Sequence, residues 1–297
     1  MWTEDFLTYL EAELNRSPLT IEVYRNSLKQ FREFLDEKAE QLAWDEVDED
    51  VVRDWMVELM ERGENARTVC KKLSALKTFY RFLLQRGWVK RDPVHNLQGP
   101  KKEKLLPTFV REQEMDELLD GQYFSDDLQG QRDRLILLTL YSTGIRRAEM
   151  VGLNWKDVDF SLKQLKVTGK RNKQRIVPFG TEMEQALNQY RQLLKTEEER
   201  LGSLPAVFRS VRTGKRITSQ QIYEVVKKYL SLVTTLKKKS PHVLRHSFAT
   251  AMLNHEADLQ SVKDLLGHVN LATTEIYTHT TFEELKRMYN QAHPRAK

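Results

Sequence analysis

The residues with the most evident chemistry lie in the last third of the chain. His242 and Arg245 are three residues apart, so on a helix they share one face. His268 follows a glycine, and Tyr277 lies in the polar segment Thr-Glu-Ile-Tyr-Thr-His. A guanidinium grips two phosphate oxygens at once, while an imidazole donates to a third or moves a proton. Since a tyrosine beside such cations is a candidate nucleophile, these residues predict chemistry on a phosphate.

Each of these residues taken alone has a second interpretation. His242 and His246 are spaced i, i+4, which also suits a metal site, although no carboxylate or cysteine nearby completes a ligand set. His246 is then a hydrogen-bonded structural histidine, His268 a capping or core histidine, and Tyr277 a partly buried tyrosine. The residues by themselves leave these alternatives open.

A basic helix is predicted far upstream, at about residues 65–86. Its apolar positions Val69, Leu73, Leu76, Tyr80 and Leu83 recur at helical spacing and form a core stripe. From residue 65 to residue 91 the chain has eight basic residues and no acidic one. A basic and hydroxyl-bearing face suits a DNA groove and its phosphates, and a solvated helix face is the alternative. The residues of this face are Arg67, Lys71, Ser74 and Thr78, flanked by Lys77 and Arg81.

The chain length and the positions of prolines and glycines predict two domains that position these residues. The chain has 297 residues, of which 40% are hydrophobic, enough for two cores. Prolines, a glycine and a lysine cluster mark a linker at 99–107. We expect a four-helix domain at 1–98 and a second domain at 108–297. The second domain is mainly helical, with a hairpin formed by strands near 164–167 and 174–179. The fold class is therefore mainly α with a small β-hairpin sheet.

Composition limits the cellular setting. No stretch approaches the roughly 18 apolar residues that a membrane span requires, and the acidic N-terminus lacks the apolar run of a signal peptide. A single cysteine excludes an intrachain disulfide and fits a reducing compartment. The expected protein is cytoplasmic and has no membrane contact.

Taken in order, six segments resemble the motifs of the tyrosine recombinases, most closely the Xer-type group that resolves chromosome dimers. Residues 74–83 are similar to the DNA-clamping helix of that family. The remaining segments are similar to its first arginine motif, its β-hairpin lysine motif, its histidine–arginine motifs and its nucleophile motif, and they span 143–149, 169–178, 242–250 with 265–268, and 276–279.

This resemblance implies a role for each matching residue. Tyr277 attacks the scissile phosphate and forms a 3′-phosphotyrosyl bond. Arg146 and Arg245 hold the non-bridging oxygens, and Lys170 protonates the leaving 5′-oxygen. The remaining roles are proton transfer at the tyrosine, a hydrogen bond to the phosphate and support of the site, and they fall to His242, His268 and Glu149. Fixed cations stabilise a pentacoordinate phosphorane more than the ground state, so no metal or other cofactor is implied.

Two residues compete with neighbours for these roles. Arg147 adjoins Arg146, and Lys173 follows Lys170 in the same turn. The motif register selects Arg146 and Lys170, so we expect Arg147 and Lys173 to contact DNA backbone, together with Lys239 of the basic loop 237–240. Where the family often has a glycine, this chain has Glu256, which puts in doubt the left-handed cap that a glycine supplies there.

The resemblance also implies how the protein acts. We expect a C-shaped clamp on duplex DNA, a cyclic tetramer with itself or a paralogue on two sites, and exchange through a Holliday junction. A further partner that the resemblance implies is a septal DNA translocase. The apolar stripe Phe282, Leu285 and Met288/Tyr289 either docks into the neighbouring protomer or packs on its own domain. The alternative functions are a mobile-element integrase or transposon recombinase, a type IB topoisomerase-like enzyme, a non-catalytic DNA-binding protein and a metal phosphodiesterase.

Overall fold

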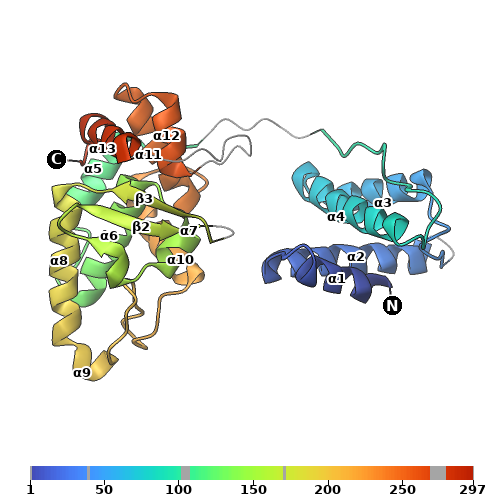
Figure 1. Ribbon diagram of the computed structural model, residues 1–297, viewed down its shortest axis with the longest axis horizontal. Helices are drawn as coiled ribbons and strands as arrows, with labels where there is room; N and C mark the ends of the chain where they lie inside the picture. The colour runs from blue at the N-terminus through green and yellow to red at the C-terminus, as the bar shows by residue number, and fades with distance from the viewer. Residues whose placement is uncertain (1, 39–40, 102–107, 170–171, 268–278, 297) are drawn as a thin grey trace. The chain divides into compact units, whose positions relative to one another are not determined.

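The chain forms two compact units, Met1–Leu105 and Leu106–Lys297 (Figure 1). The structure is a computed structural model that describes residues 2–38, 41–101, 108–169, 172–267 and 279–296. The prediction of a mainly helical chain with a small sheet is confirmed. Within the part of the chain that the structure describes, no helix is long and apolar enough to cross a membrane.

The first unit is a four-helix module. Its helices are α1 (Trp2–Ala12), α2 (Pro18–Lys38), α3 (Glu49–Glu61) and α4 (Ala66–Gln85). Asn65 caps α4, because its side chain accepts a hydrogen bond from the Thr68 backbone at 3.0 Å. The predicted core stripe of this helix is buried in full. Aromatic rings from the other helices fill the centre, with Phe6 edge-on to Phe79 at 5.2 Å between ring centroids.

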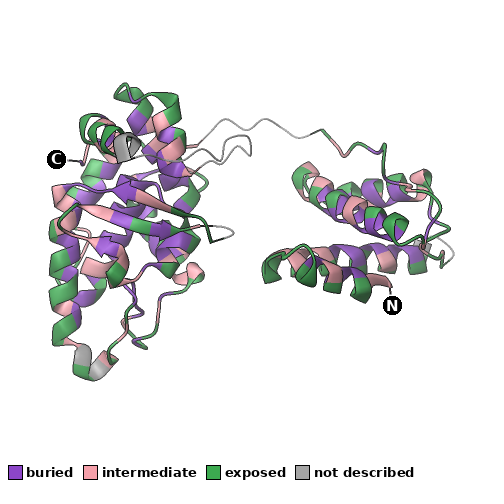
Figure 2. Ribbon diagram, in the orientation of Figure 1, coloured by how far each residue is buried: buried purple, intermediate pink, exposed green. Residues whose placement is uncertain are grey.

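The second unit has nine α-helices, one 3-10 turn and three strands in its described residues. The helices are α5 (Glu112–Asp120), α6 (Leu128–Thr143), α7 (Arg147–Gly152), α8 (Thr181–Thr196), α9 (Glu198–Leu201), α10 (Ser219–Val233), α11 (Pro241–Asn254), α12 (Leu259–Leu266) and α13 (His279–Ala292). Helix α6 is buried on nearly every side from Leu135 to Thr143 and forms the centre of the unit (Figure 2). It ends at Gly144, which has the left-handed φ of 59° that a helix C-cap commonly adopts.

The sheet is a three-stranded antiparallel meander of β1 (Val158–Asp159), β2 (Gln164–Thr168) and β3 (Gln174–Pro178). The predicted hairpin is β2–β3, in which Val167 pairs with Arg175 and Leu165 with Val177. Of residues 155–160, only Val158 and Asp159 pair in the sheet. Trp155–Asp157 instead forms a 3-10 turn, closed by the Asp157 amide donating to the Asn154 carbonyl.

Glu256, which stands where the family often has a glycine, lies just after the end of α11. The helix ends at Asn254, and two residues later Glu256 has a φ of 63°. The chain therefore adopts the left-handed turn without a glycine, at a cost of roughly 1–2 kcal/mol for an L-residue.

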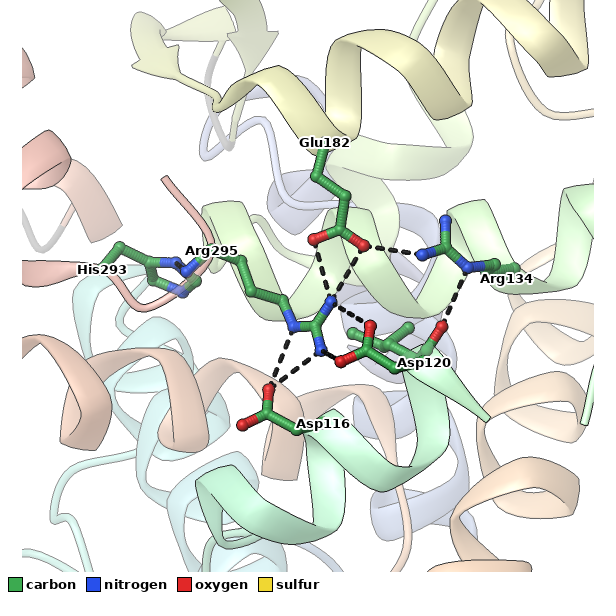
Figure 3. A network of polar contacts seen from close by, with 7 residues as sticks. Asp116, Asp120, Arg134, Glu182, His293 and Arg295 are labelled. Atoms are coloured by element: carbon green, nitrogen blue, oxygen red, sulfur yellow. Dashed lines mark hydrogen bonds and ion pairs between the residues drawn. The ribbon is translucent and has the colours of Figure 1, made fainter. Parts of the chain in front are cut away.

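The C-terminal tail is fixed to its own unit. Tyr289 and His293 are buried, and α13 packs against α11 and α12. Arg295 then donates to Asp116 at 2.9 Å, to Asp120 at 2.7 Å and to Glu182 at 2.9 Å (Figure 3). In this single chain the stripe expected on α13 thus faces its own domain at Leu285, Met288 and Tyr289, while the Phe282 side chain lies outside the described residues.

Candidate active site

Arg146 and Glu149 form one unit at the start of α7. The Arg146 backbone amide donates to Glu149 Oε2 at 2.7 Å, and its Nη1 donates to Oε1 at 2.9 Å. The Arg146 side chain is 42% exposed, whereas the Glu149 side chain is 2% exposed. The carboxylate therefore caps the helix and orients the guanidinium, whose other face remains open to solvent.

Arg245 comes from α11 and is buried. Its Nη1 donates to the Gly144 carbonyl and its Nη2 to the Leu266 carbonyl, both at 2.6 Å. Burial, chiefly, together with the neighbouring guanidiniums of Arg146 and Arg175, lowers the pKa of Arg245 to about 10. The side chain still carries its charge at neutral pH, so a buried cation lies at the junction of α6, α11 and α12.

Arg175 on β3 belongs to the same cluster, and our sequence reasoning missed it. Its Nη1 and Nη2 donate to the two carboxylate oxygens of Glu149, at 2.7 and 3.0 Å. Its Nε donates to the Leu265 carbonyl at 2.9 Å. The sequence does contain a signal for Arg175. Side chains alternate along a strand, so Arg175 lies on the same face as Val177. A charge on a buried strand face needs a partner, which predicts an ion pair or hydrogen bonds at this position.

Glu149 is ionised at the centre of these cations. Burial by itself raises the pKa of Glu149, but hydrogen bonds from the Arg175 side chain and the Arg146 backbone outweigh it, so the pKa lies below its usual range. The guanidiniums of Arg146, Arg175 and Arg245 all interact electrostatically with the single carboxylate of Glu149. Cations gathered in this way at a partly open site favour the binding of an anion.

The C-terminal end of α12 supplies the remaining partners. Leu265, Leu266 and Gly267 each offer a backbone carbonyl to a different arginine, with Arg146 Nη2 donating to Gly267 at 3.1 Å. The last carbonyls of a helix carry partial negative charge, so this end attracts cations. Gly267 has a φ of 65°, and a Cβ there would lie 3.1 Å from Arg175 Cδ, so the glycine permits the close approach.

The histidine pair lies beside this cluster on α11. His242 and His246 are exposed, and their Nε2 atoms are 3.1 Å apart, which is hydrogen-bond distance. In the described ranges no group of three or more His, Cys, Asp and Glu side chains has the arrangement that would hold a metal ion. The structure gives the metal alternative no third ligand among these residues.

Lys170, His268 and Tyr277 lie outside the described residues. The residues directly before Lys170 and His268 nevertheless reach the cluster. Gly169, directly before Lys170, lies against Glu149, because a Cβ at Gly169 would be 3.1 Å from Glu149 Oε1. Gly267, directly before His268, accepts the hydrogen bond from Arg146.

The predicted DNA-contacting residues are mostly exposed. On α4, Arg67, Lys71, Ser74 and Arg81 are exposed, while Lys77 and Thr78 are half-buried. Lys77 donates to the His95 carbonyl at 3.3 Å, and Thr78 Oγ1 donates to the Ser74 carbonyl at 2.9 Å. In the second unit Arg147 and Lys173 are exposed and Lys239 is half-buried. The basic face of α4 is therefore available for a large anionic partner.

Comparisons with known proteins agree with this geometry. Residues 108–284 match the model of the phage integrase family, and residues 3–87 match a phage integrase N-terminal SAM-like domain. The tyrosine recombinase XerC of Chlorobaculum tepidum is 40% identical over 99% of this chain and 95% of its own length. Two solved structures share the fold. The XerH recombinase bound to a palindromic difH substrate has a TM-score of 0.73 and 22% identity, and covers 97% of this chain and 84% of that one. The lambda integrase tetramer bound to a Holliday junction has a TM-score of 0.65 and 15% identity, and covers 92% and 74%.

Proposed function

The chain belongs to the phage integrase family and is a site-specific tyrosine recombinase, and from this premise we propose that it cuts and rejoins duplex DNA through Tyr277. The observation that carries the proposal is the convergence of Arg146 and Arg245 on the end of α12, with Glu149 orienting the first. Preorganised cations stabilise charge that develops in a phosphorane, and they act without reorganisation at the moment of reaction.

The proposed reaction conserves the energy of the phosphodiester. The Tyr277 oxygen attacks phosphorus and releases the 5′-oxygen, which takes a proton from Lys170. His242 assists removal of the tyrosine proton, and His268 donates to the phosphate. A tyrosine has a pKa near 10 in water, so nearby cations are needed for attack at neutral pH. The 5′-hydroxyl of a second strand then reverses the same step, so joining requires no nucleotide cofactor.

The proposed partners are duplex DNA and further copies of a recombinase. Arg67, Lys71 and Arg81 present exposed charge on α4, Arg147 and Lys173 do so on the catalytic unit, and Lys239 of the same unit is half-buried. We assign the DNA-contacting role to these residues together with Ser74, Lys77 and Thr78. The proposed domains are 1–98 and 108–297, joined by a linker at 99–107, and they close on DNA as a C-shaped clamp. A cyclic tetramer would act on two sites, with the C-terminal segment as its connection.

The proposed biological role is the resolution of chromosome dimers at a terminus site in the cytoplasm, with a paralogue and a septal translocase as candidate partners. The relatives named XerC favour this role over a mobile-element integrase. Cleavage of a replication-terminus sequence, with and without a paralogue, separates the two roles. Preference for the ends of a mobile element would favour the alternative.

A suicide substrate nicked beside the cleavage position tests the chemistry. The wild-type protein should form a covalent DNA adduct in the presence of EDTA, and Tyr277→Phe should form none. An adduct with Tyr277→Phe would move the nucleophile to another residue. Loss of the wild-type adduct in EDTA would revive a metal-dependent reaction.

A further inference from the structure

Arg175 connects three segments that carry the proposed catalytic residues. It is the second residue of β3, one pair away from the segment 169–173 that connects β2 to β3 and includes Lys170. Its two terminal nitrogens bind Glu149, which orients Arg146, and its Nε binds Leu265 near the end of α12, three residues before His268. We propose that Arg175 is a positioning residue for strand cleavage, which holds these three segments in register and leaves the charge of Arg146 for the phosphate. The inference rests on the proposed function.

The first part of the argument is charge. The Glu149 carboxylate is 2% exposed, and a buried carboxylate must be neutralised by its partners. Arg175 does this with two hydrogen bonds from a side chain that is itself 16% exposed. Arg146, at 42% exposure, gives Glu149 one side-chain hydrogen bond. Without Arg175, Arg146 would be the cation left with a hydrogen bond to Glu149 among the residues described above, and its affinity for a phosphate would fall.

The second part is geometry. The Arg175 guanidinium is planar and donates in two directions, to a carboxylate on α7 and to a carbonyl on α12. A lysine has a single ammonium group and does not reproduce this fork. The Arg175 side chain also packs against Gly267, whose carbonyl accepts from Arg146. Displacement of Arg175 therefore shifts both partners of Arg146 together, Glu149 and Gly267.

The experiment compares Arg175→Ala, Arg175→Lys and the double variant Arg175→Ala/Glu149→Gln. The matched control is Arg134→Ala, because Arg134 also donates to one carboxylate, Glu182, and to one helix-end carbonyl, Leu119. Three quantities are measured for each protein: the single-turnover rate of adduct formation at saturating DNA, the Kd for the site, and Tm.

We expect Arg175→Ala to slow adduct formation about 10- to 100-fold, the range for loss of hydrogen bonds to a charged group. The Kd should change little, because duplex binding is distributed over many phosphate contacts. Arg175→Lys should recover only part of the rate. Adding Glu149→Gln to Arg175→Ala should also recover part of the rate, since it removes the carboxylate charge that competes for Arg146. Arg134→Ala should lower Tm and leave the rate unchanged.

Three results would overturn the inference. The first is a normal rate of adduct formation in Arg175→Ala. The second is a rate loss in Arg134→Ala that is as large, for the same loss of Tm, as the rate loss in Arg175→Ala. The third is a double variant that is slower than Arg175→Ala. These outcomes are separable from failure of the proposed function. If the wild-type protein forms no Tyr277-dependent adduct, the proposed function fails and the inference falls with it. If the adduct forms and Arg175→Ala matches the wild type, only the inference fails.

Discussion

The Nη1 of Arg245 lies 2.6 Å from the carbonyl oxygen of Gly144, a residue 101 positions earlier in the chain. The Nη2 of the same guanidinium reaches the Leu266 carbonyl at the end of α12. One buried side chain thus joins the end of the central helix α6 to the helix end that precedes His268. Its charge is held by backbone carbonyls, whose hydrogen bonds fix its direction.

Arg245→Lys should abolish measurable cleavage while the protein still folds. A lysine keeps the charge but has no planar fork to reach both carbonyls, so one buried acceptor loses its donor. We expect a loss of roughly 1–3 kcal/mol in the free energy of unfolding, the usual cost of a buried unsatisfied group. Urea denaturation and suicide-substrate trapping measure the two effects. Cleavage at the wild-type rate would show that the two carbonyl bonds do not position this cation.

Glu256→Gly should stabilise the protein. Glu256 is exposed and holds a φ of 63°, which costs an L-residue roughly 1–2 kcal/mol. Glycine avoids that cost but loses about 0.5–1 kcal/mol to its greater freedom in the unfolded chain. The expected net gain is up to about 1.5 kcal/mol in urea denaturation. Glu256→Ala, which removes the same side chain and keeps a Cβ, is the control and should bring no gain.

Acid should loosen the C-terminal tail through His293. Its Nε2 lies 3.2 Å from the Tyr141 carbonyl, and its Nδ1 accepts from the Arg295 amide at 3.1 Å. The neutral Nε2–H tautomer satisfies both contacts. Burial, chiefly, lowers the pKa of His293 from 6.5 to about 3, so between these values the unfolded chain binds the extra proton. The stability from this site is present above about pH 6.5 and is lost as the pH falls toward 3.

The expected loss from this histidine is about 2 kcal/mol between pH 6.5 and pH 5. Urea denaturation of the wild type and of His293→Gln at both pH values isolates the effect, because the other titrating groups are common to the two proteins. The variant should be less stable at pH 6.5 and should have the flatter pH dependence. Equal slopes in the two proteins would contradict a neutral buried His293.

The anchoring of Arg295 offers a test of whether the tail docks within one chain or between chains. Arg295→Glu reverses the charge that the tail carries, and the double substitution Asp116→Lys/Asp120→Lys reverses the charge of the site that binds it (Figure 3). Each protein alone should recombine poorly. In an alternating ring of the two, every tail would meet a site of opposite charge if docking is between protomers, so mixing should restore recombination.

If the tail stays on its own unit during recombination, mixing should restore nothing. Combining all three substitutions in one chain is the control. In this variant the tail is negative and its binding site is positive, both within one chain and between two copies. The variant should therefore be active whether the tail docks on its own unit or on a neighbouring protomer. Inactivity of that control would show that charge pairing alone does not hold the tail.

Much of this protein could be predicted from local features of its sequence. The core stripe of α4, the β2–β3 hairpin and the order of the motifs follow from periodicity and residue type, which do not depend on distant contacts. The resemblance of the motifs to those of the tyrosine recombinases selected Arg146, Glu149 and Arg245, and the structure brings these three together. Tyr277, His268 and Lys170 remain predictions that rest on the motifs.

Only the tertiary structure decided what those residues touch. Arg245 and Arg175 donate to the backbone carbonyls of Gly144, Leu265 and Leu266. Every residue has such a carbonyl, so the sequence does not indicate which of them accepts a hydrogen bond. The left-handed turn at Glu256 was likewise unpredicted, because its local cost is met by packing elsewhere. The sequence determined which charges are present, and the packing of α6, α11, α12 and β3 determined which of them share a buried carboxylate and which keeps its charge for an anion.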